Sequence, residues 1–339
     1  MADTESIPRN ITNAVHFNGT GELNPAMESA TSFIIAAGFI LFTSFIGILG
    51  NTLVFWYLCF KIKRTKYTVY IINLSVADLS YLIFISLLMC FTILHFLKQE
   101  LTDDQETVMF ALEILHGLVN YADMFLLTAI SVERCMAIYC PMWYRYNRPT
   151  FQSLLVCVIS WGLSILVTLV DNLGCPVELF ETVGARCTAV HTFLSVLVFL
   201  LIIPTMVIAS LSMLIMVKKS SRQHHPPKLV IVIVATVFVF LISVAPVRVL
   251  WLLLYLQILP AGFSSAAFFF AVHMCISINC SVNPFIYFLV GRQKMQGVWN
   301  FLEKGLKKVF REEEDEEGRG KEEATKGIDE GDTTESNSS

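Results

Sequence analysis

Charge is what this sequence has least of. Only 15% of its 339 residues are Asp, Glu, Lys or Arg, whereas 55% are hydrophobic. Soluble domains carry about 25% charged residues, so this composition predicts a chain that faces lipid over most of its length. Basic and aromatic residues are not interleaved on a polar scaffold anywhere, so a nucleic-acid partner is not expected.

Catalytic and metal-site motifs are also missing. The sequence has no GxSxG, HExxH or P-loop pattern, and its acidic residues are not paired at catalytic spacing, so an enzyme is not expected. Its nine cysteines form no CxxC pair and no Cys/His cluster with metal-ligand spacing. Most of them lie in apolar runs and are expected to be small core residues. Residues 1–30 are polar and lack the basic and apolar regions of a signal peptide.

Long apolar runs dominate the rest of the chain. A helix of about 20 residues crosses a bilayer. We therefore expect an all-α membrane protein, a bundle of seven transmembrane helices at residues 33–60, 69–94, 108–139, 154–170, 192–217, 229–255 and 265–290. The runs must be helical, because an open strand would leave backbone groups unsatisfied in lipid. They are continuous rather than alternating, which excludes a β-barrel.

The short loops predict how the bundle is oriented. Basic residues favour the cytoplasmic side of a membrane. They gather in the first, third and fifth connections, as Lys61, Lys63, Arg64, Lys66, Arg145, Arg148, Lys218, Lys219, Arg222 and Lys228. The N-terminus is then outside the plasma membrane and the C-terminus inside. Asn10 and Asn18 are in outer glycosylation sequons, whereas the sequon at Asn337 falls in the cytosol and is expected to be bare.

Four segments follow from this topology. We expect a glycosylated extracellular tail at 1–32, the bundle at 33–290, an amphipathic helix on the inner leaflet at 291–310 and an acidic disordered tail at 311–339. Apolar residues at helical spacing between lysines predict the amphipathic helix. Serines and threonines follow the acids of the tail, which suits receptor kinases and a basic partner such as arrestin. A solvating tail without a partner is the alternative.

Polar side chains within the apolar runs are costly in lipid and are therefore expected to be functional. They are Asn51, Asp78, Asp123, Glu133, Arg134, Arg248, Asn279 and Asn283. Prolines interrupt three of the runs, at Pro204, Pro246 and Pro284. A proline frees a carbonyl and bends its helix, which gives a bundle hinges.

Taken in order, these residues resemble the motifs of rhodopsin-like (family A) G-protein-coupled receptors. The matching positions are Gly50-Asn51, residues 74–78 (LSVAD), Glu133-Arg134-Cys135, Trp161, Pro204 and residues 283–287 (NPFIY). Residues 128–135, 141–145 and 283–288 are more closely similar to the Mas and Mas-related receptors. The resemblance implies a ligand-activated receptor that signals through heterotrimeric G proteins.

Two departures from family A are shared with Mas-related receptors. Val244 stands where a tryptophan is expected two residues before Pro246, so the usual tryptophan rotamer switch cannot operate. Met109 stands where a cysteine normally ties the third helix to the second outer loop. The resemblance implies a disulfide between Cys175 and Cys187 instead, and two unpaired thiols are the alternative.

The resemblance also implies a polar ligand site near the outer end of the bundle. Its expected residues are Glu113, His116, Asp171, His191, Arg248 and His273. Asp171 matches an acid of Mas-related receptors for cationic ligands, although His191 replaces their second acid; a water-facing interfacial carboxylate is the alternative. Arg248 is similar to Mas and is a candidate partner for a ligand carboxylate. The expected ligand is an extracellular peptide or a small polar molecule.

A sodium pocket is implied by the same family. Asp78 resembles its second-helix acid, and Asn279 and Asn283 resemble its seventh-helix contributors.

Asp123 departs from the pattern of the sodium pocket, which has a small neutral residue at this position. Because it lies eleven residues before Arg134, about 16 Å along a helix, it should reach the level of Asp78. Two buried carboxylates cannot both be ionised and unpaired, so either a cation such as sodium bridges them or they share a proton. A hydrogen bond from Asp123 to a backbone group or an asparagine is the alternative, and no other cofactor is expected.

The resemblance assigns G-protein coupling and activation to Glu133, Arg134, Cys135, Pro246, Pro284 and Tyr287. Arg134 is expected to be held by Glu133 at rest and to meet a G-protein helix once the inner ends of the helices separate. A seven-helix transporter or channel is the alternative function. Transporters usually contain internal repeats, and none is visible in this sequence.

Overall fold

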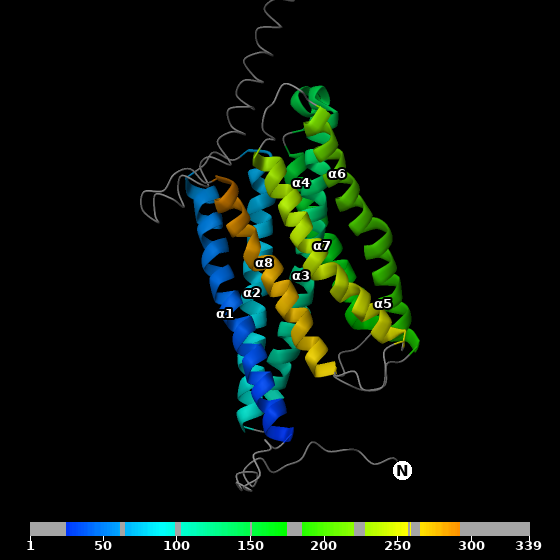
Figure 1. Ribbon diagram of the computed structural model, residues 1–339. Helices are drawn as coiled ribbons and strands as arrows, with labels where there is room; N and C mark the ends of the chain where they lie inside the picture. The colour runs from blue at the N-terminus through cyan, green and yellow to red at the C-terminus, as the bar shows by residue number, and fades with distance from the viewer. Residues whose placement is uncertain are drawn as a thin grey trace, which may run out of the picture.

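The computed structural model describes residues 25–61, 65–98, 103–149, 151–174, 185–219, 228–256, 258 and 265–291. Over these residues the chain is helical, and its helices run side by side as an elongated bundle (Figure 1). The elements are α1 (Pro25–Phe60), α2 (Thr68–Lys98), α3 (Asp103–Tyr139), η1 (Trp143–Asn147), α4 (Gln152–Gly174), α5 (Ala185–Leu197), η2 (Val198–Ile202), α6 (Ile203–Lys219), α7 (Lys228–Tyr255) and α8 (Ser265–Gly291).

Seven stretches of these helices are long and apolar enough to cross a membrane, which confirms the expected number of spans. The fifth span, Cys187–Met216, is shared by α5, η2 and α6, so α7 and α8 are the sixth and seventh spans. The amphipathic helix expected at 291–310 and the acidic tail at 311–339 lie outside the described residues, apart from Gly291 at the end of α8. Of the N-terminal tail expected at 1–32, residues 1–24 lie outside the described residues, whereas residues 25–32 form the start of α1.

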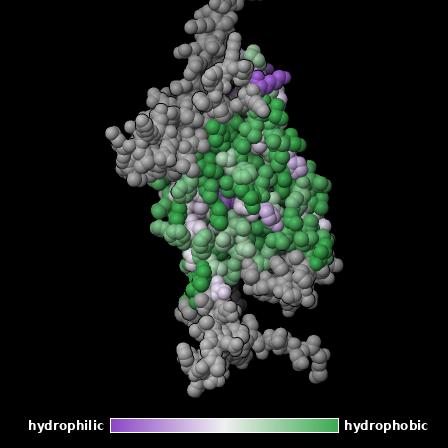
Figure 2. Space-filling view, viewed as in Figure 1, coloured by the Kyte–Doolittle hydropathy of each residue, from purple (hydrophilic) through white to green (hydrophobic). Residues whose placement is uncertain are grey.

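A lipid-facing surface covers the bundle. Large apolar side chains are more than half exposed on several helices, among them Phe42 of α1, Leu154 of α4 and Phe238 of α7, at 62%, 60% and 63%. In Figure 2 the described part of this face is mostly hydrophobic. An apolar surface of this extent on a soluble monomer would be unusual, whereas a bilayer buries it.

The third span is the centre of the bundle. Helix α3 packs against α2, α4, α6 and α7, while α1 packs against α2 and α8 at one side. Close approach of α1 depends on Gly47, since a Cβ atom there would meet Ser281 of α8 and would lie 2.6 Å from Cδ1 of Leu82 of α2. Small residues let membrane helices approach closely where no hydrophobic effect drives their association.

Two of the three prolines within spans are accommodated in different ways. Pro204 is the second residue of α6, and the π-helical segment η2 directly before α6 absorbs the break in the hydrogen-bond ladder. Pro284 lies inside α8 and leaves the carbonyl of Cys280 without its usual N–H donor. Asn51 of α1 replaces that donor, because its Nδ2 donates to the Cys280 carbonyl at 3.0 Å and to the Gly47 carbonyl at 3.1 Å. Asn51 therefore joins α1 to the proline bend of α8.

One end of the bundle carries the basic loop residues. The end of α1 with Lys61, the segment before α2 with Lys66, the end of α3 and the starts of α4 and α7 all lie there (Figure 1). We call this the basic end. The chain enters α1 at the opposite end, the end at which α5 also begins (Figure 1).

Candidate functional site

Four charged or polar side chains from four helices meet near the end opposite the basic end. This acid–base cluster consists of Tyr121 of α3, Asp171 of α4, His191 of α5 and Arg248 of α7. The Tyr121 hydroxyl donates to Oδ2 of Asp171 at 3.3 Å, and Nε2 of His191 lies 3.5 Å from Oδ1 of Asp171. The guanidinium carbon of Arg248 lies 5.3 Å from the centre of the Tyr121 ring. The structure thus brings three of the six expected ligand residues together.

The two ends of this cluster differ in what they have left to bind. Asp171 has two polar neighbours and its side chain is 24% exposed, although its Oδ1 is buried and accepts no hydrogen bond from the described residues. Nη2 of Arg248 is buried and has no hydrogen-bond partner among the described residues. A buried donor without a partner carries the full cost of its lost hydration, so an incoming acceptor is favoured there. A group with negative charge is the strongest acceptor for a guanidinium.

Two of the remaining ligand residues form a separate histidine pair. The rings of His116 of α3 and His273 of α8 have their centres 5.0 Å apart. The Tyr81 hydroxyl of α2 lies 3.2 Å from Nδ1 of His273. Nδ1 of His116 lies 3.1 Å from the Leu112 carbonyl, which can only accept, so this nitrogen carries the proton of the hydrogen bond. Glu113, the sixth residue, is half-buried on α3, three residues before His116.

A carboxylate cluster lies in the middle of the bundle, and it contains the four residues expected at the ion site. Nδ2 of Asn283 donates to Oδ2 of Asp78 at 2.9 Å, and Nδ2 of Asn279 donates to Oδ2 of Asp123 at 3.3 Å. The thiol of Cys280 is a fifth member. Ligand atoms of Asp78, Asp123 and Cys280 all lie within 4.8 Å of one another. All five side chains are essentially buried, at 2% exposure or less.

The cluster has the chemistry of a small cation site. Oδ1 of Asp78 and Oδ1 of Asp123 are buried and have no hydrogen-bond partner among the described residues, and neither have the amide oxygens of Asn279 and Asn283. Four oxygen acceptors without donors fit a hard cation, which prefers oxygen ligands, or a proton shared between the carboxylates. The alternative to an ion or proton site was that Asp123 only hydrogen-bonds a backbone group or an asparagine. Asp123 does accept a hydrogen bond from Asn279, and it also lies close to Asp78.

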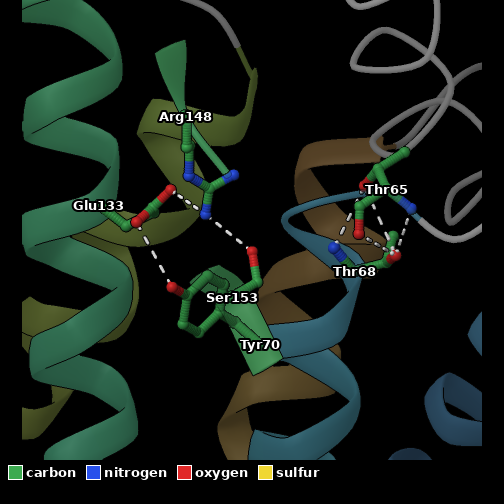
Figure 3. Close-up of polar contacts among 6 residues, drawn as sticks. All are labelled: Thr65, Thr68, Tyr70, Glu133, Arg148 and Ser153. Atoms are coloured by element: carbon green, nitrogen blue, oxygen red, sulfur yellow. Dashed lines mark hydrogen bonds and ion pairs between the residues drawn. The ribbon is translucent and has the colours of Figure 1, made fainter. Parts of the chain in front are cut away.

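Residues at the basic end form a loop cluster (Figure 3), which consists of Tyr70, Glu133, Arg148 and Ser153. Glu133 forms an ion pair with Nη2 of Arg148 and accepts a hydrogen bond from the Tyr70 hydroxyl at 3.3 Å. The same Nη2 donates to Oγ of Ser153 at 2.7 Å. Glu133 of α3 is therefore held by a residue of the following loop and by α2, which the sequence did not reveal.

The neighbouring arginine has a different environment. The guanidinium of Arg134 lies over the ring of Tyr67, 3.9 Å from its centre, besides other contacts. Tyr67 is fully buried and lies between Thr65 and Thr68. These two threonines exchange hydrogen bonds between hydroxyl and backbone N–H, at 2.8 and 3.2 Å, which fixes the start of α2 (Figure 3).

The other residues expected to serve activation are spread along the spans. Cys135 is half-buried and free, and Tyr287 and Pro284 are buried in α8. Pro246 lies on an exposed face of α7. Val244 stands where family A receptors have the tryptophan. It is 2% exposed and packs in the larger cluster of buried apolar residues.

Sequence reasoning missed the tyrosines and the loop arginine. Tyr70, Tyr81 and Tyr121 lie within apolar runs, where an aromatic residue is most simply interpreted as core. A hydroxyl that is buried needs a partner, and that rule was the available signal. Arg148 was counted as one of many loop charges, and its position directly before Pro149 was the signal that its backbone is restricted.

Cys187 is disulfide-bonded, while Cys59, Cys90, Cys135, Cys140, Cys157, Cys275 and Cys280 are free. Its expected partner, Cys175, lies outside the described residues, so that pairing stays a prediction.

We expect non-reducing peptide mapping to find Cys175 and Cys187 in one linked pair. Cys187→Ser should then lower the stability of the receptor by about 3 kcal/mol, the chain-entropy value for a loop of roughly this size. The exposed free thiol Cys90, changed to serine, is the matched control. Alkylation of both thiols in the native protein would contradict the pairing.

Comparison with known proteins agrees with this architecture. Residues 50–287 match the family described as "7 transmembrane receptor (rhodopsin family)". The chain is 36% identical to the human proto-oncogene Mas over 274 residues, which cover 79% of this chain and 81% of that protein. It is 34% identical to mouse Mas-related G-protein coupled receptor member H over 270 residues, with 79% and 80% covered. Against rat member F it is 33% identical over 267 residues, with 78% and 76% covered. With all seven spans present, the chain belongs to the rhodopsin family of G-protein-coupled receptors, among the Mas and Mas-related receptors, and not to a family of enzymes.

Proposed function

We propose that this receptor lies in the plasma membrane with its N-terminus outside and responds to an extracellular peptide or small polar ligand. The observation that carries the proposal is the acid–base cluster. It joins four helices, and it combines a carboxylate with a guanidinium that has one buried nitrogen with no hydrogen-bond partner in the described part of the chain. A ligand with an anionic group satisfies Arg248. If the ligand also carries a cationic group, as peptides and amino acids do, Asp171 is its partner.

The activation step follows from differential affinity. A ligand shifts the bundle toward its open form only if it binds that form better. Contacts from Tyr121, Asp171, His191 and Arg248 link α3, α4, α5 and α7, so a ligand that replaces some of them changes how these helices pack at one end. At the basic end, Arg134 then meets a helix of a heterotrimeric G protein. Receptor kinases and arrestin act on the acidic tail.

Guanine-nucleotide exchange tests the function. Membranes that contain the receptor and a panel of heterotrimeric G proteins are exposed to small peptides and amino acids. An active compound should raise nucleotide exchange, and its binding should weaken when guanine nucleotide is added. Arg134→Gln is the control, since it should abolish exchange and leave ligand binding in place. Binding that is insensitive to guanine nucleotide for every G protein in the panel would contradict receptor function.

The carboxylate cluster has a proposed role of its own. A sodium ion, or a proton shared by Asp78 and Asp123, would be held by these two residues together with Asn279 and Asn283. The cation or proton neutralises buried negative charge in the closed bundle. Its loss leaves that charge uncompensated, which favours the open form.

The orientation is tested by glycosylation. We expect N-glycans at Asn10 and Asn18 and none at Asn337, because only the first two sequons lie on the outside. Glycosidase should increase the gel mobility of the wild-type protein, and it should have no effect on the variant with Asn10→Gln and Asn18→Gln. A glycan that maps to Asn337 would mean that the topology is inverted.

A further inference from the structure

The Glu133 carboxylate is held by residues from outside its own helix. One oxygen faces Nη2 of Arg148, in the segment between η1 and α4, and the other accepts the Tyr70 hydroxyl of α2 (Figure 3). Nη2 of Arg148 also reaches Ser153 at 2.7 Å, in the first turn of α4. Three helices and the loop after α3 therefore meet at one carboxylate–guanidinium pair.

Burial makes this pair different from the ion pairs of an exposed loop. The side chain of Arg148 is 0% exposed and that of Glu133 is 6% exposed. Exposed pairs contribute little because water screens them, whereas a buried pair that loses one partner leaves an uncompensated charge. Opening of the basic end must therefore keep the Glu133–Arg148 pair intact, exchange its partners or admit water to it.

Local backbone structure directs the Arg148 side chain inward. The π-helical segment η1 ends at Asn147, and Arg148 is extended, with φ −76° and ψ 120°. Pro149 follows, and a residue before proline is restricted to this extended region. The guanidinium also lies 4.7 Å from the centre of the Tyr144 ring, which belongs to η1. The loop thus presents Arg148 to α3 from a restricted backbone.

We propose that Arg148 is a positioning residue that holds Glu133 in the resting receptor, so that the loop between α3 and α4 sets basal activity. Arg134, the next residue along α3, is over Tyr67 and approaches the G protein only when the end of α3 is released. The inference rests on the proposed coupling role of Glu133 and Arg134. It adds that the counter-charge which restrains this helix end comes from the loop cluster.

Basal nucleotide exchange, measured without ligand at matched surface expression, tests the proposal. Arg148→Gln should raise basal exchange at least about fivefold, the lower end of usual coupling between sites. Glu133→Gln should raise it too, and the double variant should match the stronger single variant, because both changes remove one interaction. Lys61→Gln is the matched control. Lys61 is exposed, and its Nζ lies 5.5 Å from the centre of the Trp56 ring. The change removes one positive charge from the basic end and should leave basal exchange unaltered.

A second measurement does not depend on G-protein coupling. Cys135 follows Arg134 on α3 and is half-buried and free, whereas Cys140 is exposed and free. In membranes without G protein, Arg148→Gln should speed alkylation of Cys135 relative to Cys140. If this ratio rises but no variant drives exchange, the positioning role holds and the coupling proposal fails. An unchanged ratio and unchanged basal exchange in Arg148→Gln, or equal effects in Lys61→Gln, would overturn the inference.

Conservative variants keep the test decisive if Arg148→Gln does not reach the cell surface. Arg148→Lys retains the positive charge for Glu133 but lacks the fork that reaches Ser153 at the same time. Ser153→Ala removes the second contact alone. Both should give smaller rises in basal exchange and in the Cys135 ratio than Arg148→Gln is expected to give. If both are indistinguishable from wild type, the role of the loop is refuted.

Discussion

Replacing Arg248 with glutamine is expected to raise the agonist concentration needed for half-maximal signalling by about 10- to 100-fold. A hydrogen bond to a charged group contributes roughly 1.5–3 kcal/mol, and about 1.4 kcal/mol corresponds to a tenfold change in affinity. The buried Nη2 of Arg248 has no partner among the described residues, so it is the donor most in need of an acceptor from the ligand. Concentration–response curves at equal surface expression measure the effect.

Ligand chemistry supplies the control for Arg248. An agonist with a free carboxylate is compared with its amide on the wild-type receptor and on Arg248→Gln. The amide should be weaker on wild type, and the difference should largely disappear in the variant. Arg248→Lys should be intermediate, because it keeps the charge without the planar fork. If the amide and the acid are equally potent on wild type, Arg248 does not bind an anion of the ligand.

Asp171→Asn is the comparison within the same cluster. Its carboxylate already accepts from Tyr121 and lies beside His191, so a ligand cation must share it. We expect a loss of about tenfold for a ligand with a cationic group, at the low end for a charged hydrogen bond. A larger loss from Asp171→Asn than from Arg248→Gln would reverse the order of importance proposed here.

The second large effect is expected at Asp123. In wild-type membranes, agonist affinity should fall when sodium replaces a large organic cation, and it should also change between pH 5.5 and 8. Coupling between two sites is typically about 5- to 150-fold, and buried carboxylates that lie within reach of each other favour a strong response. Asp123→Gly should reduce the response to sodium and pH and raise the agonist affinity measured in sodium.

An isosteric variant separates charge from hydrogen bonding at this site. Asp123→Asn keeps an oxygen that accepts from Nδ2 of Asn279, now at 3.3 Å, but it removes the negative charge. If the carboxylate pair holds a cation or a proton, Asp123→Asn should behave as Asp123→Gly does. If instead Asp123 only hydrogen-bonds Asn279, Asp123→Asn should retain wild-type behaviour. A receptor that responds to neither sodium nor pH, and that Asp123→Gly leaves unchanged, has no such site.

The carboxylate cluster was accessible to sequence reasoning because it depends on position along the helices. Asp123 lies eleven residues before Arg134, and a fixed rise per residue places it at the depth of Asp78. Asn279 and Asn283 are one turn apart on α8, so they face the same way. Cys280 is adjacent to Asn279, yet a cysteine in an apolar run gives no sign that it faces two acids.

The acid–base and loop clusters were only partly predictable. Which side chains meet across helices depends on rotation and tilt, and the hydrophobic pattern of a membrane helix constrains these weakly, since lipid and core are both apolar. Asp171 was expected at the end of its helix, at about 170, whereas α4 continues to Gly174 and places Asp171 against Tyr121. The partner of Glu133 depends on the path of the loop, which η1 and Pro149 determine.

The amide of Asn51 has a consequence for how the seventh span can move. A helix that bends at a proline usually exposes a carbonyl, and in lipid that exposure costs several kcal/mol, about as much as other unsatisfied polar groups. Here the carbonyl of Cys280 is satisfied from α1 rather than from α8 itself. The segment of α8 before Pro284 is thereby anchored to the first span, and the bond does not depend on the angle at the proline. The segment after Pro284, which includes Tyr287, can therefore pivot at the basic end without breaking the hydrogen bond from Asn51. The first span thus fixes the part of α8 before the proline, and the part after it is free to change its angle at the basic end.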